Sequence, residues 1–251
     1  MTPEAVLQVL HDAATAVSEA LTGLEDWGPA GTRGRPDQYR SDILADAAAL
    51  DVLDRAGLGA FSEESGVHHP DRPVRVVIDP VDGSTNASRG LPWWATSLCA
   101  VSADGPIAAV VVNQASGVRF SASLGGGAFQ DGSVIAPSGS TALSSSIVAF
   151  SGYPRRYVGW NQYRSLGAAA LDICAVACGV LDGFIDCAAQ SLAPWDYLGG
   201  LLICREAGAS VGEAFGRDLV VTEGGERRTV VAGATPQLLD ELVEARLKLS
   251  E

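Results

Sequence analysis

Apolar residues recur at helical spacing at both ends of the chain. In the first segment they fall every three or four positions, at Val6, Leu10, Ala13, Val17, Leu21 and Leu24. This spacing predicts an amphipathic helix that opens the chain. A second helix is expected from an N-cap at Ser41 to Arg55, with Gly57 just beyond its end. A closing amphipathic helix is expected over residues 236–249, with Pro236 at its start.

The chain between these helices carries patterns typical of strands. Runs rich in apolar and β-branched residues predict strands at 74–79, 96–103, 107–114, 182–188 and 229–234. Glycine-rich turns within 118–135 predict a hairpin, and apolar segments at 164–181 and 195–209 predict two further helices. A strand-rich middle followed by alternating helices and strands predicts layered α+β structure and then α/β structure. We therefore expect an N-terminal part, residues 1–145, and a C-terminal part, residues 146–251.

Composition and charge narrow the classes of function. The chain has 251 residues, 47% of them hydrophobic, and a formal net charge of −13. A negative chain without a basic patch argues against nucleic acid and anionic membranes as partners. No stretch has the composition of a membrane span or a signal peptide, and five scattered cysteines are typical of a reducing compartment. We therefore expect a cytoplasmic protein, which can still bind a phosphorylated molecule if a metal ion supplies positive charge.

The segment VIDPVDGSTN, residues 77–86, places two carboxylates close together at the end of an expected strand. Pro80 is expected to end the strand after Asp79, and Asp82 then returns toward the same point. Two such carboxylates repel each other unless a proton or a hard divalent cation lies between them. If residues 84–86 open a helix, their backbone N–H groups form an anion site beside the acids.

A turn followed by a helix cap is the alternative interpretation of this segment. Asp-Pro and Asp-Gly form turns, and Asp, Ser, Thr and Asn cap helices without any chemistry. Two further acidic segments weigh against it: FSEESG carries adjacent Glu63 and Glu64, and PWDYLGG carries Asp196 at the expected start of a helix. Each alone is typical of a solvated loop or an N-cap. Together with Asp79 and Asp82 they form an acidic set with the donors for two hard cations.

Taken in order, SEESG, IDPVDGSTN and WDYLGGLLICREAGA resemble the three motifs of the inositol monophosphatase family of magnesium-dependent phosphatases. The segment RSLGAAALDICAVACGVLDGFID, between the second and third motifs, is similar as well, so the resemblance covers nearly the whole chain. It implies a layered αβαβα sandwich of the sugar-phosphatase type and a homodimer. It also implies two or three Mg²⁺ ions in each site and inhibition by lithium.

The resemblance further implies roles for individual residues. Glu63, Asp79 and the Val81 carbonyl would hold a first metal ion. Asp79 would also hold a second ion, together with Asp82 and Asp196. This arrangement would explain the paired aspartates, because two cations would neutralise them.

The same resemblance implies a catalytic set and a substrate-binding set. The acid in YRSDIL is similar to the one that partners the motif's hydroxyl residue to activate water, so the implied catalytic residues are Asp42, Glu63 and Ser84. Backbone N–H groups of the motif would bind phosphate oxygens, and two later positions look like sugar-hydroxyl contacts. The implied substrate-binding residues are Asp82, Gly83, Ser84, the backbone of Ala169, and Asp186.

Some positions depart from the family's pattern. Ser84 stands where the family usually has Thr, which keeps the hydroxyl but loses the methyl that restricts its rotamer. Ser62 stands where Gly commonly precedes the two glutamates, and only Arg33 and Arg35 are near the place of a mobile-loop lysine. The segment CAAQSLAP, 187–194, is longer than is typical. Because this segment borders the substrate, the resemblance defines the substrate least.

The expected function is hydrolysis of the phosphomonoester of a small polyol or sugar by metal-activated water, with inositol 1-phosphate as the leading candidate. Cations neutralise the phosphate and lower the pKa of water, so the reaction requires no histidine and no nucleophilic side chain. Fructose 1,6-bisphosphate, histidinol phosphate and 3′-phosphoadenosine 5′-phosphate are alternative substrates for the same site. The alternative outside enzymes is a regulatory protein that binds metal or sugar phosphate without turnover.

Overall fold

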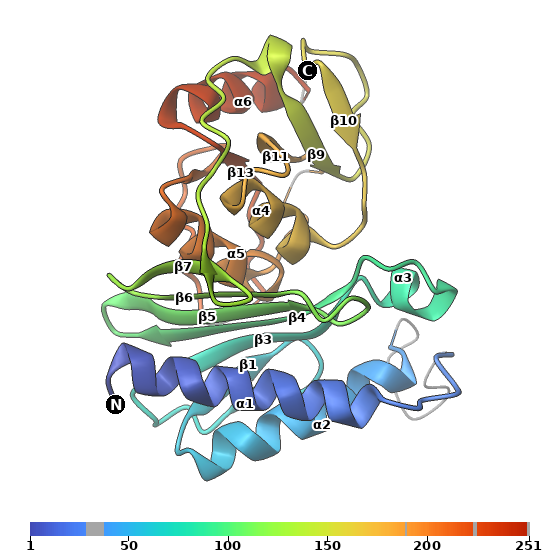
Figure 1. Ribbon diagram of the computed structural model, residues 1–251, viewed down its shortest axis with the longest axis vertical. Coiled ribbons are helices and arrows are strands. Elements are labelled where there is room, and N and C mark those ends of the chain that lie inside the picture. The colour runs from blue at the N-terminus through green and yellow to red at the C-terminus, as the bar shows by residue number, and fades with distance from the viewer. Residues whose placement is uncertain (29–37, 189, 223–224, 250–251) are drawn as a thin grey trace.

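Two β-sheets alternate with three layers of helices (Figure 1). The computed structural model describes residues 1–28, 38–188, 190–222 and 225–249. From one end to the other the layers are a helix pair, an eight-stranded sheet, a second helix pair, a five-stranded sheet and one helix. The predicted αβαβα sandwich is therefore the observed architecture.

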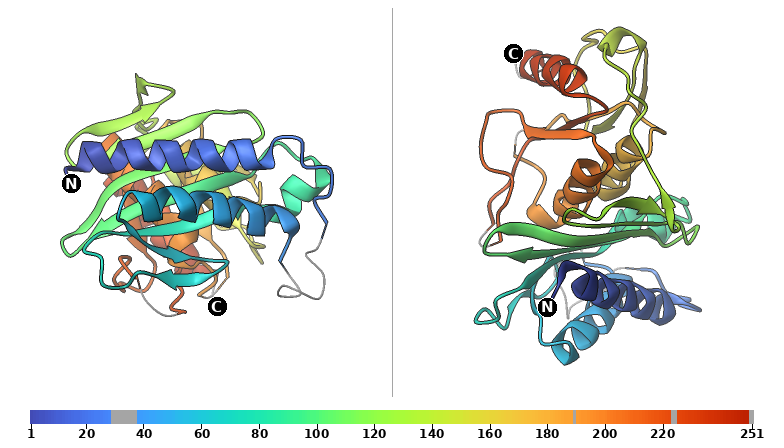
Figure 2. Two further views of the ribbon diagram at one scale, coloured as in Figure 1. Left: turned by 90° about the horizontal axis from the view of Figure 1, so that it is seen from below. Right: turned by 60° about the vertical axis from the view of Figure 1, so that its left-hand side comes forward.

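The first layer consists of α1 (Pro3–Leu21) and α2 (Arg40–Arg55), which lie side by side across one face of the eight-stranded sheet (Figure 2). The apolar stripe of α1 is buried as predicted, although the helix ends at Leu21, before Leu24. The predicted N-cap at Ser41 is wrong, because α2 begins one residue earlier. The N-terminus of α2 is capped by Asp42, whose carboxylate accepts a hydrogen bond from the Tyr39 N–H at 2.9 Å.

The eight-stranded sheet is antiparallel except for one parallel pair, β1 with β3. In spatial order its strands are β2 (Gly66–His68), β1 (Gly59–Ser62), β3 (Arg75–Asp82), β4 (Ala95–Ser102), β5 (Gly105–Asn113), β6 (Arg119–Ser123), β7 (Gly127–Gln130) and β8 (Ser133–Val134). The hairpin expected at 118–135 is present as β6 and β7 with short β8 beside them. The side of this sheet opposite α1 and α2 faces the second helix layer.

Strand β3 does not end at Pro80, so that prediction is wrong. Asp79 pairs with Ser97 of β4, the register then shifts, and Asp82 pairs with Ala95. Pro80 lies within this irregularity, where a strand tolerates a residue that has no N–H to donate. Both aspartates are therefore carried by sheet structure and not by a flexible turn.

The second helix layer consists of α4 (Ala169–Ala177) and α5 (Pro194–Ala207). The predicted helix at 164–181 is wrong at both ends, because Gly167 has a φ of 88° and the segment before Ala169 is a loop. Helix α5 packs closely against its neighbours. A Cβ at Gly199 would lie 2.8 Å from Ser97 Oγ, and one at Gly200 would lie 2.7 Å from Ile173 Cγ2.

The last two layers belong to the C-terminal half. The five-stranded sheet has the order β10 (Gln162–Arg164), β9 (Ile147–Ser151), β11 (Gly183–Asp186), β13 (Val230–Gly233) and β12 (Ser210–Glu213). Helix α6 (Pro236–Lys248) covers its outer face, and the short α3 (Ser84–Arg89) follows β3. The division of the chain after residue 145 stays a prediction. That residue ends the 3₁₀ helix η2 (Leu143–Ser145), and η2 lies in the sequence between the last strand of the eight-stranded sheet and the first strand of the five-stranded sheet. Across the described ranges, every helix is too short or too polar to cross a membrane.

Candidate active site

Three carboxylates from distant parts of the sequence converge where β3 approaches α5. One oxygen of each of Glu63, Asp79 and Asp196 lies within 4.8 Å of the others. Glu63 follows β1, which pairs in parallel with β3, and its N–H donates to the Ile78 carbonyl at 3.0 Å. This pairing places Glu63 beside Asp79. Asp196 is brought in by the first turn of α5, where Ser97 Oγ donates to the Trp195 carbonyl at 3.2 Å.

Burial and neighbouring carboxylates raise the pKa of both aspartates in this cluster. Burial raises the pKa of Asp79 well above its usual value, and the charges of Glu63, Asp82 and Asp196 raise it further. Burial also raises the pKa of Asp196 to about 7, with Asp82 as the next cause. A cluster of this kind holds protons near neutral pH unless a positive charge replaces them.

Asp82 lies next to this cluster but is turned toward the second helix layer. Its Oδ2 accepts a hydrogen bond from the Ala170 N–H at 2.8 Å, at the start of α4. Burial raises the pKa of Asp82 to about 8, the bond from Ala170 opposes this, and Asp172 and Glu63 add to it. Asp82 is not one of the described carboxylates that meet within 4.8 Å, although its charge raises the pKa of both Asp79 and Asp196.

Ser84 lies between the two groups with which the sequence associates it. Its Oγ donates to the Val81 carbonyl at 2.8 Å, and its hydroxyl lowers the pKa of Asp42. Burial is the larger effect and raises the Asp42 pKa to about 6. The structure thus brings Asp42, Ser84 and Val81 together at the N-terminal end of α3.

The left-handed turn at Gly83 and the side chain of Asn86 hold α3 against the loop before α4. Gly83 has a φ of 87°, and a Cβ there would lie 3.1 Å from the Gly167 carbonyl. Asn86 Nδ2 donates to the carbonyls of Trp93 and Leu166, both at 2.7 Å. The sequence did not predict this role for Asn86; the signal was its place at the end of the DGSTN motif.

A cavity of about 170 Å³ opens beside Asp82 and Asp196. Its walls come from β9, the loop before α4, α4 itself and the start of α5. The residues that line it are Asp82, Phe150, Ser151, Gly152, Ser165, Gly167, Ala168, Ala169, Asp172, Leu192 and Asp196. Asp172, which the sequence analysis left unassigned, accepts a hydrogen bond from Trp93 Nε1 at 2.9 Å. The cavity therefore has an acidic floor and walls of mostly small residues.

Ala169 and Asp186 have different positions relative to this cavity. Ala169 lines it, as expected of a backbone contact to substrate, whereas Asp186 is not among the described residues on its wall. Asp186 ends β11 and is fully buried, and its charge raises the pKa of Asp196. Its Oδ1 accepts hydrogen bonds from the Ala188 N–H and Ser191 Oγ, at 3.0 and 2.7 Å.

Two interpretations of the sequence concern residues near the rim of the site. The alternative interpretation of Asp196 as the N-cap of α5 is wrong: the helix begins at Pro194, and Asp196 Oδ2 accepts a hydrogen bond from the Ala193 N–H at 2.6 Å. Arg33 and Arg35, the candidates for a loop cation, lie outside the described residues.

The donor set fits hard divalent cations. Carboxylate and carbonyl oxygens are the ligands that Mg²⁺ and Ca²⁺ prefer, and no sulfur or imidazole ligand belongs to the cluster of Glu63, Asp79 and Asp196 among the described residues. The Val81 carbonyl accepts one bond from Ser84 and keeps a second lone pair. The raised carboxylate pKa values are what a cation site shows when protons replace the cation.

Similarity to known proteins extends over both sheets. The model of the inositol monophosphatase family matches residues 41–251. An inositol-1-monophosphatase of Mesorhizobium japonicum is 31% identical over 260 residues, 93% of each chain, and a fructose-1,6-bisphosphatase of Pyrococcus furiosus is 32% identical over 205 residues, 80% of each. The crystal structure of extragenic suppressor protein suhB from Bartonella henselae superposes with a TM-score of 0.81 at 27% identity, covering 97% of this chain and 99% of the other.

Proposed function

This chain belongs to the inositol monophosphatase family, and from that premise we propose that it hydrolyses the phosphomonoester of a small polyol or sugar with divalent metal ions. Inositol 1-phosphate is the first candidate substrate. The observation that carries the proposal is the convergence of Glu63, Asp79 and Asp196 within 4.8 Å, with Asp196 also lining a cavity. A cluster of acids with a purely structural role would not require a cavity beside it, whereas a binding site does.

The residues divide between holding metal and handling substrate. Glu63, Asp79 and the Val81 carbonyl would hold one ion. A second ion would lie between Asp79, Asp82 and Asp196. Bound Mg²⁺ would supply positive charge to the phosphate and make water more acidic.

The proton of the attacking water requires an acceptor close to the metal ligands. Asp42 and Ser84 are placed for this, because the hydroxyl donates to the Val81 carbonyl and acts on the Asp42 carboxylate. Burial raises the Asp42 pKa to about 6, close to the operating range of a general base. The Gly83 and Ser84 N–H groups would bind phosphate oxygens, and the backbone of Ala169 and the Asp186 carboxylate would bind substrate hydroxyls.

Cavity size favours a small substrate. Pockets for drug-sized ligands occupy roughly 300–1,000 Å³, whereas this cavity measures about 170 Å³. A single polyol or sugar ring suits that volume better than a nucleotide does. The names of the two enzyme relatives, an inositol-1-monophosphatase and a fructose-1,6-bisphosphatase, support the same class.

The proposal is tested by phosphate release from a panel of esters with Mg²⁺ and with a chelator. The panel contains inositol 1-phosphate, fructose 1,6-bisphosphate, histidinol phosphate and 3′-phosphoadenosine 5′-phosphate. We expect Mg²⁺-dependent turnover, fastest with inositol 1-phosphate. Metal binding without turnover of any ester would contradict the proposal and favour a binding role. The same proposal includes inhibition by lithium, a homodimeric state and a cytoplasmic location. Each of these is to be measured on the same protein.

Ser84→Ala is expected to lower kcat about 100-fold and to leave KM nearly unchanged, because the hydroxyl orients the nucleophile. Ser84→Thr keeps the hydroxyl and is the matched control, with kcat close to that of the parent. Steady-state kinetics on the best substrate of the panel measures both variants. A higher KM with an unchanged kcat in Ser84→Ala would instead assign Ser84 to binding alone.

A further inference from the structure

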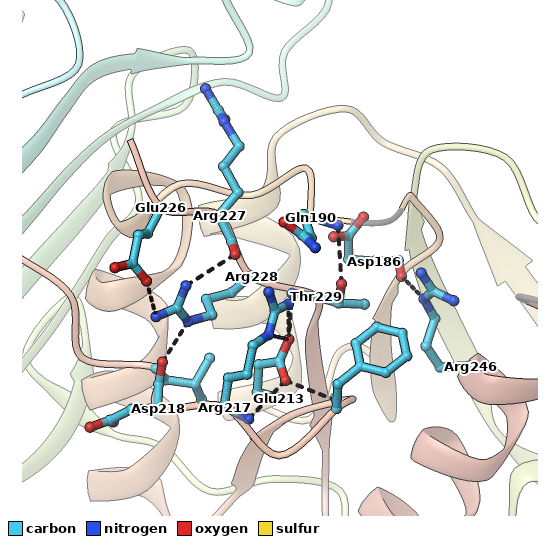
Figure 3. Close-up of polar contacts among 12 residues, drawn as sticks. Asp186, Gln190, Glu213, Arg217, Asp218, Glu226, Arg227, Arg228, Thr229 and Arg246 are labelled. Atoms are coloured by element: carbon cyan, nitrogen blue, oxygen red, sulfur yellow. Dashed lines mark hydrogen bonds and ion pairs between the residues drawn. The ribbon is translucent and has the colours of Figure 1, made fainter. Parts of the chain in front are cut away.

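Helix α6 places one arginine in the interior of the protein. Arg246 is 1% exposed and is the largest fully buried side chain. Its Nε donates to the Asp186 carbonyl (Figure 3). Its Nη2 donates to the Ala188 carbonyl at 3.2 Å. Its Cζ also lies 5.8 Å from the centre of the Phe215 ring. Burying a guanidinium is costly, so its hydrogen bonds to this backbone require a reason.

The backbone that Arg246 binds begins the β11–α5 connection, residues 187–193, which is described except at residue 189. The other end of this connection is held from the segment before β13 by three separate contacts. Gln190 N–H donates to Thr229 Oγ1 at 3.2 Å (Figure 3). Arg227 Nη1 donates to the Ser191 carbonyl at 2.7 Å, and Leu192 pairs with Arg228 through backbone bonds of 2.8 and 3.3 Å. Arg246 therefore anchors the β11 side and the other contacts anchor the α5 side.

The connection in turn determines where the Asp186 carboxylate points. Ala188 and Ser191 both donate to Asp186 Oδ1. Asp186 Oδ2 is buried and has no hydrogen-bond partner among the described residues. A buried carboxylate oxygen without a donor is unfavourable. Asp186 does not line the cavity in this structure, so a substrate hydroxyl would satisfy this oxygen only if substrate binding brings the two together.

We propose that Arg246 is a positioning residue for substrate recognition: it fixes the backbone of Asp186 and Ala188 and so holds the Asp186 carboxylate toward the hydroxyl groups of the substrate. The inference rests on the proposed function, and it adds the C-terminal helix to the parts of the fold that determine specificity. Arg246 itself does not touch the substrate. Arginine suits the task, because its rigid fork of N–H donors reaches two carbonyls at once, whereas lysine offers a single charged point.

The test compares two substrates of one protein. Inositol 1-phosphate has ring hydroxyls, and p-nitrophenyl phosphate has none. For Arg246→Met we expect KM for inositol 1-phosphate to rise roughly tenfold, the worth of one lost hydrogen bond. We expect kcat/KM for p-nitrophenyl phosphate to stay close to that of the parent. Arg246→Lys should lie between the two, and it also serves if the methionine variant fails to fold.

Arg217→Met is the matched control. Arg217 also lies over the Phe215 ring, at 5.9 Å, and its Nε donates to Glu213 Oε1, but among the described residues no hydrogen bond or ion pair joins it to the β11–α5 connection. The Arg217→Met substitution should lower the melting temperature without changing the preference between the two substrates. Equal losses on both substrates in Arg246→Met, or the same change of preference in Arg217→Met, would overturn the positioning role.

A mutant cycle and an exchange measurement complete the test. If Arg246 acts through Asp186, Arg246→Met should add little to the KM effect of Asp186→Asn, whereas an independent effect would be additive. Amide hydrogen exchange of the peptide covering 187–193 should become faster in Arg246→Met than in Arg217→Met. If the parent hydrolysed neither ester, the proposed function would fail. The exchange measurement would still decide whether Arg246 orders the β11–α5 connection, because exchange that is unchanged in Arg246→Met would refute that role.

Discussion

Asp79→Asn is expected to lower Mg²⁺-dependent kcat by a factor on the order of 1,000 or more and to raise the melting temperature of the metal-free protein. Asp79 is the carboxylate shared by both proposed metal ions, and a ligand that stabilises charge in the transition state is worth several kcal/mol. The amide keeps the oxygen that accepts the Val81 N–H at 3.0 Å, so the local backbone should remain in place. It removes a buried charge that repels Glu63, Asp82 and Asp196.

The control for this variant is Asp46→Asn. Asp46 is also buried and accepts a hydrogen bond from Ser62 Oγ at 2.5 Å, but it lies outside the three-carboxylate cluster. Its substitution should leave kcat near that of the parent. Circular dichroism and phosphate release on the same preparations measure both variants. Turnover of Asp79→Asn close to that of the parent would refute the metal assignment.

Removing metal is expected to make the protein less stable as the pH rises from about 5 to about 8. Burial and mutual repulsion raise the pKa of Asp196 to about 7 and that of Asp82 to about 8, against about 3.9 for an aspartate in an unfolded chain. Between those values the folded state binds more protons than the unfolded state, so its stability falls as protons are lost. The contribution is complete below the unfolded pKa and lost above the folded one.

Magnesium should reverse this dependence, because the metal requires the deprotonated carboxylates and binds more tightly as the pH rises. Thermal unfolding at pH 5, 6, 7 and 8, with a chelator and with excess Mg²⁺, measures the effect. The difference in melting temperature between the two conditions should widen steadily, by several degrees in total. A chelated protein whose melting temperature is flat or rises over this range would contradict the electrostatic account.

Local pattern was enough to predict layered α+β structure followed by α/β structure and to suggest that the acidic segments form one set. The order of the layers came from the resemblance to the family. The helices at both ends follow the apolar spacing, and α5 ends at Ala207, just before Gly208, whose left-handed φ of 93° terminates it. The errors arise where tertiary pairing overrides local preference. Pro80 was expected to end a strand, but β4 pairs with β3 on both sides of it.

Long-range hydrogen bonds explain what the sequence did not indicate. Strands β9, β10 and β12 are short, and their pairing partners lie far along the chain. Arg246 binds carbonyls 58 and 60 residues away, and backbone acceptors leave no mark in the residue pattern. Aspartate is common at N-caps, which made an N-cap the alternative interpretation of Asp196. The structure places Asp196 at the third residue of α5 instead, where its carboxylate accepts a hydrogen bond from the Ala193 N–H.

The way the two sheets terminate affects how the protein behaves at high concentration. Each sheet ends in short strands: β2 and β8 have 3 and 2 residues, and β10 and β12 have 3 and 4. An exposed strand edge is a template on which another chain can add a strand, and the hazard grows with the length of the edge. These outer strands offer too few free N–H and C=O groups to start a cross-β assembly. The long apolar strands that would aggregate, β3, β4 and β5, lie in the interior of the sheet and are paired on both sides.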